Sequence, residues 1–304
     1  MESSNSSRND KRLSLAAFAP RTVTDKLRVL QPQEVILGLF GEYVKPRERI
    51  WSGGLVHLLQ DLHFSAAASR IALSRVVTRR LLTPSRTGKF VFYTISPKLE
   101  LVHQEGRHQT FSISTDAVWD GNWTVVWYSI PEQLRLNRGR LSRWLSFRGF
   151  GSLQDGTWIA AGDRERDVVS LSRELGLGDH VITFIAKLSK AQTPRSLVDQ
   201  VWNLNALRLA YDMLAREFAP YARKGFQSKI SVRDSFIVRT RAIEMFRDTI
   251  SQDPRLPDSV LGMRWKRAEV IKSFNVLQRN LAPAAKRYFR ERAMPNSVGQ
   301  KQQL

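Results

Sequence analysis

The chain has 304 residues, a length that suits two or three domains of roughly 100 to 150 residues each. Its 48 Lys and Arg outnumber 28 Asp and Glu, and the formal net charge of +20 favours a polyanionic partner such as nucleic acid. The absence of cysteine excludes disulfides, thiolate zinc sites and cysteine nucleophiles, and no apolar run approaches the roughly 18 residues of a membrane span.

The two ends of the chain are polar. Residues 1–31 are rich in serine and lack the apolar core of a secretory signal, so we expect a disordered basic arm that is a solvated tail, with non-specific contacts to phosphates as the alternative. Residues 295–304 are also expected to be disordered. Together with the cysteine-free composition, this predicts a cytoplasmic protein that associates with the nucleoid.

Three short helices are predicted after the arm. Apolar residues recur at helical spacing over Pro32–Tyr43, with the proline suited to a first turn, and leucines recur again over residues 54–62. After a very short connection, Ser65 is a favourable N-cap for a third helix that runs to about Arg80. Two helices joined by so short a turn indicate a helix-turn-helix.

A wing is predicted behind these helices. Residues 81–83 favour a strand, residues 84–89 a turn, and residues 90–95 a second strand with aromatic and β-branched side chains. A helix from residue 97 to about 108 and a linker through residue 115 follow. We therefore expect a winged-helix DNA-binding domain over residues 32–115.

The third helix has a face that suits the major groove of double-stranded DNA. Arginine can bind guanine through two hydrogen bonds, and serine can bond several bases. Residues 65–98 hold seven basic side chains and no acidic one, which concentrates positive potential on this module, although each arginine alone also fits a solvated helix face. The residues expected to bind DNA are Arg70, Ser74, Arg75, Thr78, Arg79, Arg86 and Lys89.

A different pattern begins at Trp119. Strands and helices alternate, with strand patterns at residues 123–130, 157–160 and 180–188 and helix patterns at residues 131–147 and 166–175. This alternation predicts a small α+β sandwich over residues 116–190. Residues 191–294 predict a helical C-terminal domain with helices at 197–223, 232–251 and 270–292. The expected fold class is α+β with several domains.

Several short motifs occur in a fixed order between Gln33 and Arg292. They are Leu39–Val44 with Trp51, Leu55–Leu59, Ala72–Arg75, Trp119–Trp123, Ser129–Glu132, Gly149–Gly151, Trp158–Ile159 and Asp253–Pro257. Each is weakly specific alone, but in this order they resemble the phenylacetate-catabolism repressors, the PaaX-type family.

The resemblance implies an N-terminal winged helix-turn-helix, a central ferredoxin-like module similar to the small CRISPR-adaptation nucleases, and a helical C-terminal domain. It also implies a homodimer that represses an aromatic-compound catabolic operon until an aryl acyl-CoA thioester releases it. The chain departs from the family pattern at Arg80, where members usually have glycine, at Glu244, and in residues 202–204 and 265–267. We therefore expect a divergent paralogue with an effector other than phenylacetyl-CoA.

Two groups of residues are candidates for binding an effector. Trp119 and Trp123 are suited to hold an aromatic ligand, with interdomain packing as the alternative. Arg138 and Arg143 lie in the basic segment 131–147, which is suited to a CoA phosphate or to further DNA contacts, with a solvated face as the alternative.

Other chemistry is not favoured by the sequence. The five histidines lack metal-ligand spacing, and no phosphate-binding loop, nucleophile elbow or paired carboxylates are recognisable, so we predict no metal, no catalytic residue and no resident cofactor. Two alternatives to a ligand-controlled repressor remain open. One is a DNA-binding protein without an effector, and the other is an RNA-binding protein or nuclease that uses the ferredoxin-like domain.

Overall fold

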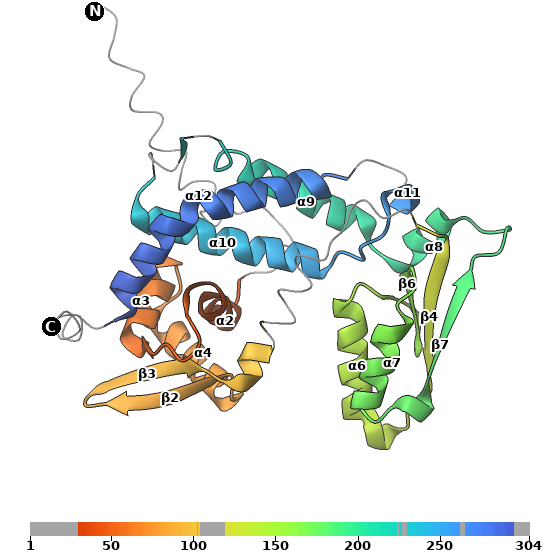
Figure 1. The fold of residues 1–304 in the computed structure, drawn as a ribbon, viewed down its shortest axis with the longest axis horizontal. Helices are drawn as coiled ribbons and strands as arrows, with labels where there is room; N and C mark the ends of the chain where they lie inside the picture. The colour runs from red at the N-terminus through yellow and green to blue at the C-terminus, as the bar shows by residue number, and fades with distance from the viewer. Residues whose placement is uncertain are drawn as a thin grey trace, which may run out of the picture. The chain divides into compact units, whose positions relative to one another are not determined.

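The structure is a computed structural model that describes residues 30–101, 103, 119–223, 225–226, 230–261 and 265–294 (Figure 1). Two compact units divide the chain. Unit 1 comprises residues up to Phe111 with Ala215–Phe246 and Ile271–Leu304, and unit 2 comprises Ser112–Leu214 with Arg247–Val270. The mixture of helices with two antiparallel sheets confirms the α+β class. Apart from Leu30 and Gln31, the predicted arm lies outside the described residues, as does the tail.

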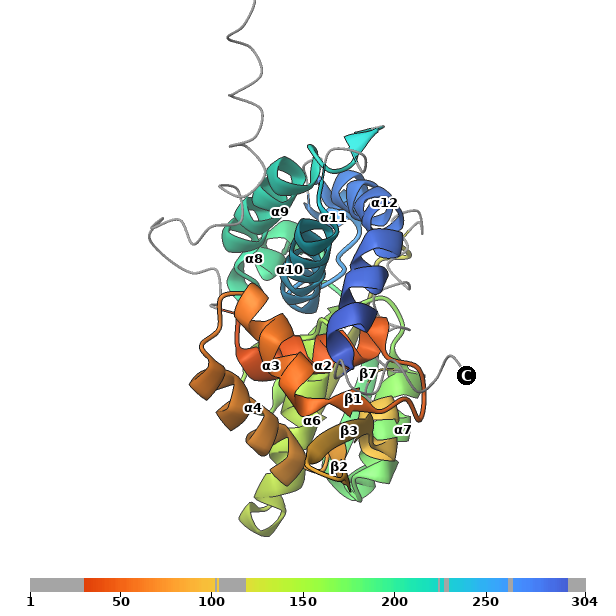
Figure 2. The same cartoon turned by 90° about the vertical axis from the view of Figure 1, so that its left-hand side faces the viewer.

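Unit 1 begins with three helices and a small sheet, seen from the side in Figure 2. The helices are α2 (Pro32–Tyr43), α3 (Ser52–Asp61) and α4 (Ala66–Thr78). The antiparallel sheet has the order β1-β3-β2, with β1 at Ile50–Trp51, β2 at Leu82–Thr87 and β3 at Phe90–Ile95. The three predicted helices are confirmed, with small shifts at their ends.

The hairpin of β2 and β3 is tighter than the sequence predicted. The turn expected over residues 84–89 is wrong in extent, because β2 pairs with β3 as far as Thr87 and only Gly88 and Lys89 connect them. Gly88 has φ +56°, a value that such short hairpin loops need. Pro84 suggested a turn, yet it lies in an edge strand, where a residue without an N–H is tolerated.

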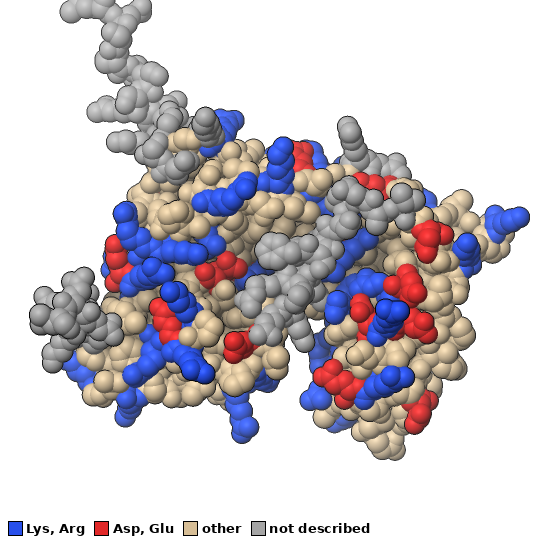
Figure 3. Space-filling view, in the orientation of Figure 1, with Lys and Arg blue, Asp and Glu red and all other residues tan. Residues whose placement is uncertain are grey.

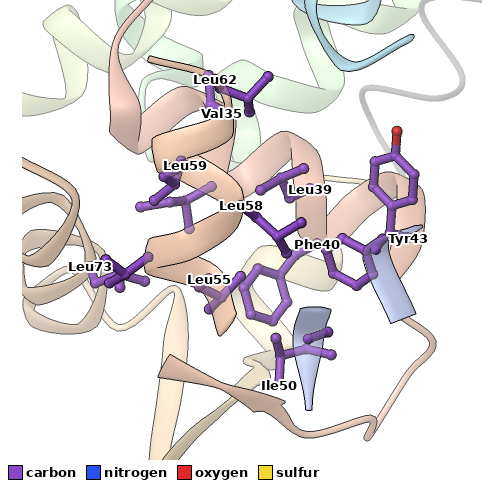
Figure 4. Packing of buried hydrophobic residues seen from close by; sticks show 14 of the residues in the cluster. Val35, Leu39, Phe40, Tyr43, Ile50, Leu55, Leu58, Leu59, Leu62 and Leu73 are labelled. Atoms are coloured by element: carbon purple, nitrogen blue, oxygen red, sulfur yellow. The ribbon is translucent and has the colours of Figure 1, made fainter. Parts of the chain in front are cut away.

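The core of unit 1 combines the N-terminal helices with α10 (Val232–Ser251) and α12 (Arg267–Ala293). Figure 4 shows leucines of α3 packed against Leu39 and Phe40 of α2. Phe236 of α10 and Phe289 of α12 belong to the same buried cluster, and the Phe289 ring stacks on Tyr43 with centroids 4.9 Å apart. Helices α2–α4 therefore share their core with segments that are distant in the sequence.

Polar contacts and one close approach also join α3 to these later helices. Asp61 accepts hydrogen bonds from Arg233 Nε and from the Tyr288 hydroxyl, each at 2.8 Å. A Cβ atom added to Gly54 would lie 2.2 Å from the Arg292 carbonyl oxygen, so only glycine fits between α3 and the end of α12. The position of α3 thus depends on α10 and α12.

Unit 2 contains strands and helices in the order β-α-β-β-α-β. These are β4 (Asn122–Tyr128), α6 (Arg135–Phe147), β5 (Gly151–Gln154), β6 (Thr157–Ala161), α7 (Glu165–Glu174) and β7 (Val181–Lys187). The sheet is antiparallel with the order β5-β6-β4-β7. Strand β5 was not predicted, because its four residues include one glycine and two polar side chains and its pairing with β6 is irregular.

Unit 2 is completed by α8 (Pro194–Val201), the first part of α9 (Leu204–Phe218) and α11 (Asp258–Leu261). The single helix predicted over residues 197–223 is wrong, since the chain becomes extended at Trp202. The side chain of Asn203 then accepts a hydrogen bond from the Ala206 N–H at 3.1 Å, which starts a new helix. Among the described residues, none of the helices combines the length and apolarity needed to cross a bilayer.

Candidate DNA-binding surface

Helix α4 begins at a side-chain cap. The Ser65 hydroxyl accepts a hydrogen bond from the Ala68 N–H at 3.1 Å, as the sequence predicted, and satisfies one of the free amides of the first turn. Ala72, Leu73 and Val76 are buried against the other helices. The buried stripe sets the rotation of α4, so the opposite face of the helix points to solvent.

All seven residues predicted to bind DNA are exposed. They are Arg70, Ser74, Arg75 and Thr78 on α4, Arg79 directly after it, and Arg86 and Lys89 in the hairpin. Among the described residues, no carboxylate forms an ion pair with any of the five cations. Ile71 on the same face is 54% exposed and offers an apolar group that suits a thymine methyl.

Thr78 is the least available of these residues for reading a base. Its hydroxyl donates a hydrogen bond to the Ser74 carbonyl at 3.0 Å, so the proton is engaged within the helix and only the oxygen can accept from a base. The Ser74 hydroxyl makes no such contact within the described chain. Ser74 is therefore the better hydrogen-bonding residue on this face.

The end of α4 is tied to the segment after β3. The Arg80 carbonyl accepts a hydrogen bond from the Ser96 hydroxyl at 2.9 Å, and the Arg79 carbonyl accepts one from Lys98 Nζ at 3.3 Å. Arg80 has φ +56°, a left-handed backbone that favours glycine after a helix. Arginine at this position therefore carries backbone strain that glycine would not.

The hairpin adds further cations, including one that sequence reasoning missed. Strands β2 and β3 lie at the lower left of Figure 1, and Figure 3, in the same orientation, shows Lys and Arg side chains projecting from that edge. Arg49 Nη2 donates to the Thr87 hydroxyl at 2.7 Å, and its guanidinium lies 4.6 Å from the Phe92 ring centroid. Arg49 directly precedes β1, in a loop whose sequence gives no sign of a DNA-binding role. The pairing of β1 with β3 brings Arg49 to the hairpin.

Removing the cap of α4 gives the first testable prediction. Ser65→Ala should lower the free energy of unfolding by about 1 kcal/mol, because the Ala68 N–H loses its partner. Urea unfolding followed by circular dichroism measures this change. Ser65→Asn should preserve most of the stability, and Ser74→Ala, an exposed position on the same helix, serves as the control. Equal midpoints for the two alanine variants would contradict the assigned cap.

The tryptophan motif at the start of unit 2 is a packed turn. The Trp119 Nε1–H donates to the Asn122 carbonyl at 2.9 Å, and Asp120 accepts the Asn122 N–H at 2.9 Å, a hydrogen bond that lowers the pKa of Asp120. Trp123 is 1% exposed and lies in a cluster with Ile159 of β6 and residues of α8 and α11. These contacts pack the tryptophan motif within unit 2.

The arginine candidates on α6 lie apart from the tryptophans. Trp123 and Val126 point to opposite faces of β4, and α6 packs on the face of Val126. Arg138 bonds to Glu132 at 3.0 Å, whereas Arg143 is exposed. The structure thus does not bring the four effector candidates into one site. Within the described ranges, His, Asp and Glu side chains nowhere gather in threes suited to hold a metal ion.

Three family profiles match successive parts of the chain: "PaaX-like protein" at residues 31–99, "PaaX protein central Cas2-like domain" at 116–198, and "PaaX-like protein C-terminal domain" at 202–291. The chain belongs to the PaaX family. The resemblance seen in its short motifs is thereby confirmed.

Two relatives of this PaaX family member are informative. A protein of Escherichia coli (strain K12) named "Transcriptional repressor PaaX" is 27% identical over 274 residues, which cover 88% of this chain and 85% of the relative. The solved structure of an uncharacterized protein, Rv0674, from Mycobacterium tuberculosis covers 85% of this chain and 98% of its own, with a TM-score of 0.51 and 22% identity. The second match concerns the fold alone.

Proposed function

We propose that this PaaX family member is a DNA-binding transcriptional repressor. In this proposal α2, α3 and α4 with the β1-β3-β2 sheet act as a winged helix-turn-helix, and α4 enters the major groove. The exposed face of α4 carries the proposal, because it joins arginine, serine and small apolar side chains without a carboxylate. The name of the E. coli relative supports repression as the outcome.

The remaining parts of the proposal follow from family membership. Unit 2 contains the β-α-β-β-α-β order of a ferredoxin-like module, and the described part of the following chain is mostly helical. We propose a cytoplasmic, nucleoid-associated homodimer without enzymatic activity that controls an aromatic-compound catabolic operon. A dimer predicts an imperfect palindrome as operator, with half-sites spaced by roughly one helical turn of DNA or a multiple of it.

The proposal is tested by separating base reading from phosphate contact. Arg70→Ala should cost about 1–3 kcal/mol of operator affinity and relax the preference at one position of each half-site. Lys89→Ala should weaken binding to all duplexes alike and reduce the slope of log affinity against log salt by about 1. Fluorescence anisotropy with a selected operator and with a random duplex measures both effects.

Arg173→Ala, which removes an exposed arginine from α7, is the matched control and should leave both affinities unchanged. The assignment fails if Arg70→Ala and Lys89→Ala change the affinities for operator and random DNA in the same way.

An aryl acyl-CoA effector is proposed from the family alone. A ligand of the native state at 100 times its dissociation constant stabilises a protein by about 2.7 kcal/mol, so a panel of aryl acyl-CoA thioesters should raise the melting temperature. The same thioester should release the protein from its operator. A panel that changes neither quantity would favour a repressor that acts without an effector.

A further inference from the structure

Three arginine side chains converge in unit 2 from separate segments. Arg148 caps the end of α6, Arg164 precedes α7, and Arg255 lies in the loop after α10. Arg148 Nη1 and Arg164 Nη2 lie 3.9 Å and 3.3 Å from the same Oδ2 atom of Asp167. One carboxylate therefore faces two guanidinium groups.

The third arginine is brought close by a glycine contact. A Cβ atom added to Gly149 would lie 3.0 Å from the Pro254 carbonyl oxygen, so the residues that follow α6 run directly against the loop that carries Arg255. Arg255 itself has φ +56°, a conformation that costs an arginine energy, and its N–H donates to Asp253 Oδ1 at 2.7 Å. The loop thus holds Arg255 in place through a strained backbone.

The other two guanidinium groups are also held by their surroundings. The Arg164 N–H donates to the hydroxyl oxygen of Thr124, a buried residue of β4, at 2.8 Å. The guanidinium of Arg164 lies 5.7 Å from the Phe150 ring centroid, and that of Arg148 lies 5.0 Å from the Trp144 ring centroid. These contacts orient the cations before any ligand arrives, which reduces the entropy lost on binding.

The positive charges of this cluster act on one another. Burial and the charge of Arg164 lower the pKa of Arg255, with a smaller effect from Arg148, while the charge of Asp253 opposes them. Arg148 Nε is buried, and among the described residues nothing accepts a hydrogen bond from it. An anion placed here would relieve the repulsion and accept the free N–H.

We propose that Arg148, Arg164 and Arg255 form a binding site for the phosphate group of a small ligand. Planar guanidinium groups match the oxygens of phosphate through paired hydrogen bonds. The Arg148 and Arg164 side chains are only 30% and 22% exposed, which suits a terminal phosphate better than the backbone of a rigid duplex. The site is independent of the DNA-binding face of α4 and does not require the proposed repressor function.

Pyrophosphate is the probe that tests this site. Isothermal titration calorimetry of the full chain, with chloride exchanged for pyrophosphate at constant ionic strength, should show saturable binding in the millimolar range or tighter. Arg148→Gln and Arg164→Gln should each weaken this binding about tenfold to a hundredfold, because each removes one or more charge-assisted hydrogen bonds. Arg173→Gln, at an exposed position near the end of α7, is the control and should bind as the original chain does.

Arg148→Lys keeps the charge but not the planar group, so it should bind with intermediate affinity and it remains informative if the glutamine variants fold poorly. Random-duplex affinity is measured in parallel, because it separates this site from the DNA-binding surface. The proposal is overturned if pyrophosphate does not bind, if Arg173→Gln weakens binding as much as Arg148→Gln, or if Arg148→Gln reduces DNA affinity as much as Lys89→Ala.

Discussion

Replacing Arg267 by methionine should destabilise unit 2 by about 3–5 kcal/mol, since a buried charge then loses its partner. The Arg267 Nε and Nη2 atoms each donate to Asp253 at 2.8 Å, and the two side chains are 4% and 0% exposed. The Tyr211 hydroxyl also donates to Asp253, and burial next to this carboxylate raises the pKa of Tyr211. Without Arg267 the carboxylate would keep hydrogen bonds but no opposite charge in contact.

Urea unfolding followed by tryptophan fluorescence measures this effect, because every tryptophan except Trp51 lies in unit 2. Arg135→Met is the control, since Arg135 pairs with Glu132 at 3.8 Å and both side chains are largely exposed. The control should change the free energy of unfolding by less than about 0.5 kcal/mol. Comparable losses in the two variants would show that the Arg267–Asp253 pair contributes no more than a surface pair.

Replacing Phe289 by alanine should cost unit 1 about 3–5 kcal/mol and weaken DNA binding with it. Phe289 lies on α12, is 1% exposed, and stacks on Tyr43 of α2. The same buried cluster contains Leu73 and Val76, which hold α4 from below. A cavity at Phe289 should therefore loosen the surface that carries Arg70 and Arg75, although no DNA-facing residue is changed.

Circular dichroism during urea unfolding measures the loss of stability. Operator affinity, measured at urea concentrations near the unfolding midpoint, measures the loss of DNA binding. Leu101→Ala is the matched control in unit 1, because the Leu101 side chain is 61% exposed. The control should leave both stability and affinity close to those of the original chain. If Phe289→Ala unfolds at the same urea concentration as the control, α12 does not contribute to the core that supports α4.

The parts of the fold that were predicted correctly are those set by neighbouring residues. Pro32 and Ser65 act within one helical turn, so the starts of α2 and α4 are readable from the chain, as are the exposed arginines of α4. Helix α10 was predicted at its full length because its apolar spacing is uninterrupted. The exposed face of α4 could be inferred from the spacing of its own apolar residues, because these residues form one buried stripe and the opposite side then faces solvent.

The features that were missed depend on contacts between distant segments. Arg49 reaches the wing only through strand pairing, and the cluster of Arg148, Arg164 and Arg255 requires Gly149 to pack against the loop at Pro254. The four effector candidates were chosen by residue type. Side chains alternate between the two faces of β4, so Trp123 lies on the face opposite α6, and Trp119 packs on the same side as Trp123. No local pattern in the sequence carries such information.

The narrow fit of Gly54 against Arg292 has a consequence for how such regulators diversify. Any side chain larger than hydrogen at position 54 would meet the carbonyl group of Arg292, which is a backbone group, so the contact restricts the residue at position 54 and not the side chain at position 292. Point substitutions on the exposed face of α4 leave this contact intact and are therefore the direct route to a new operator preference. Redesign of specificity should follow the same route and keep glycine at position 54.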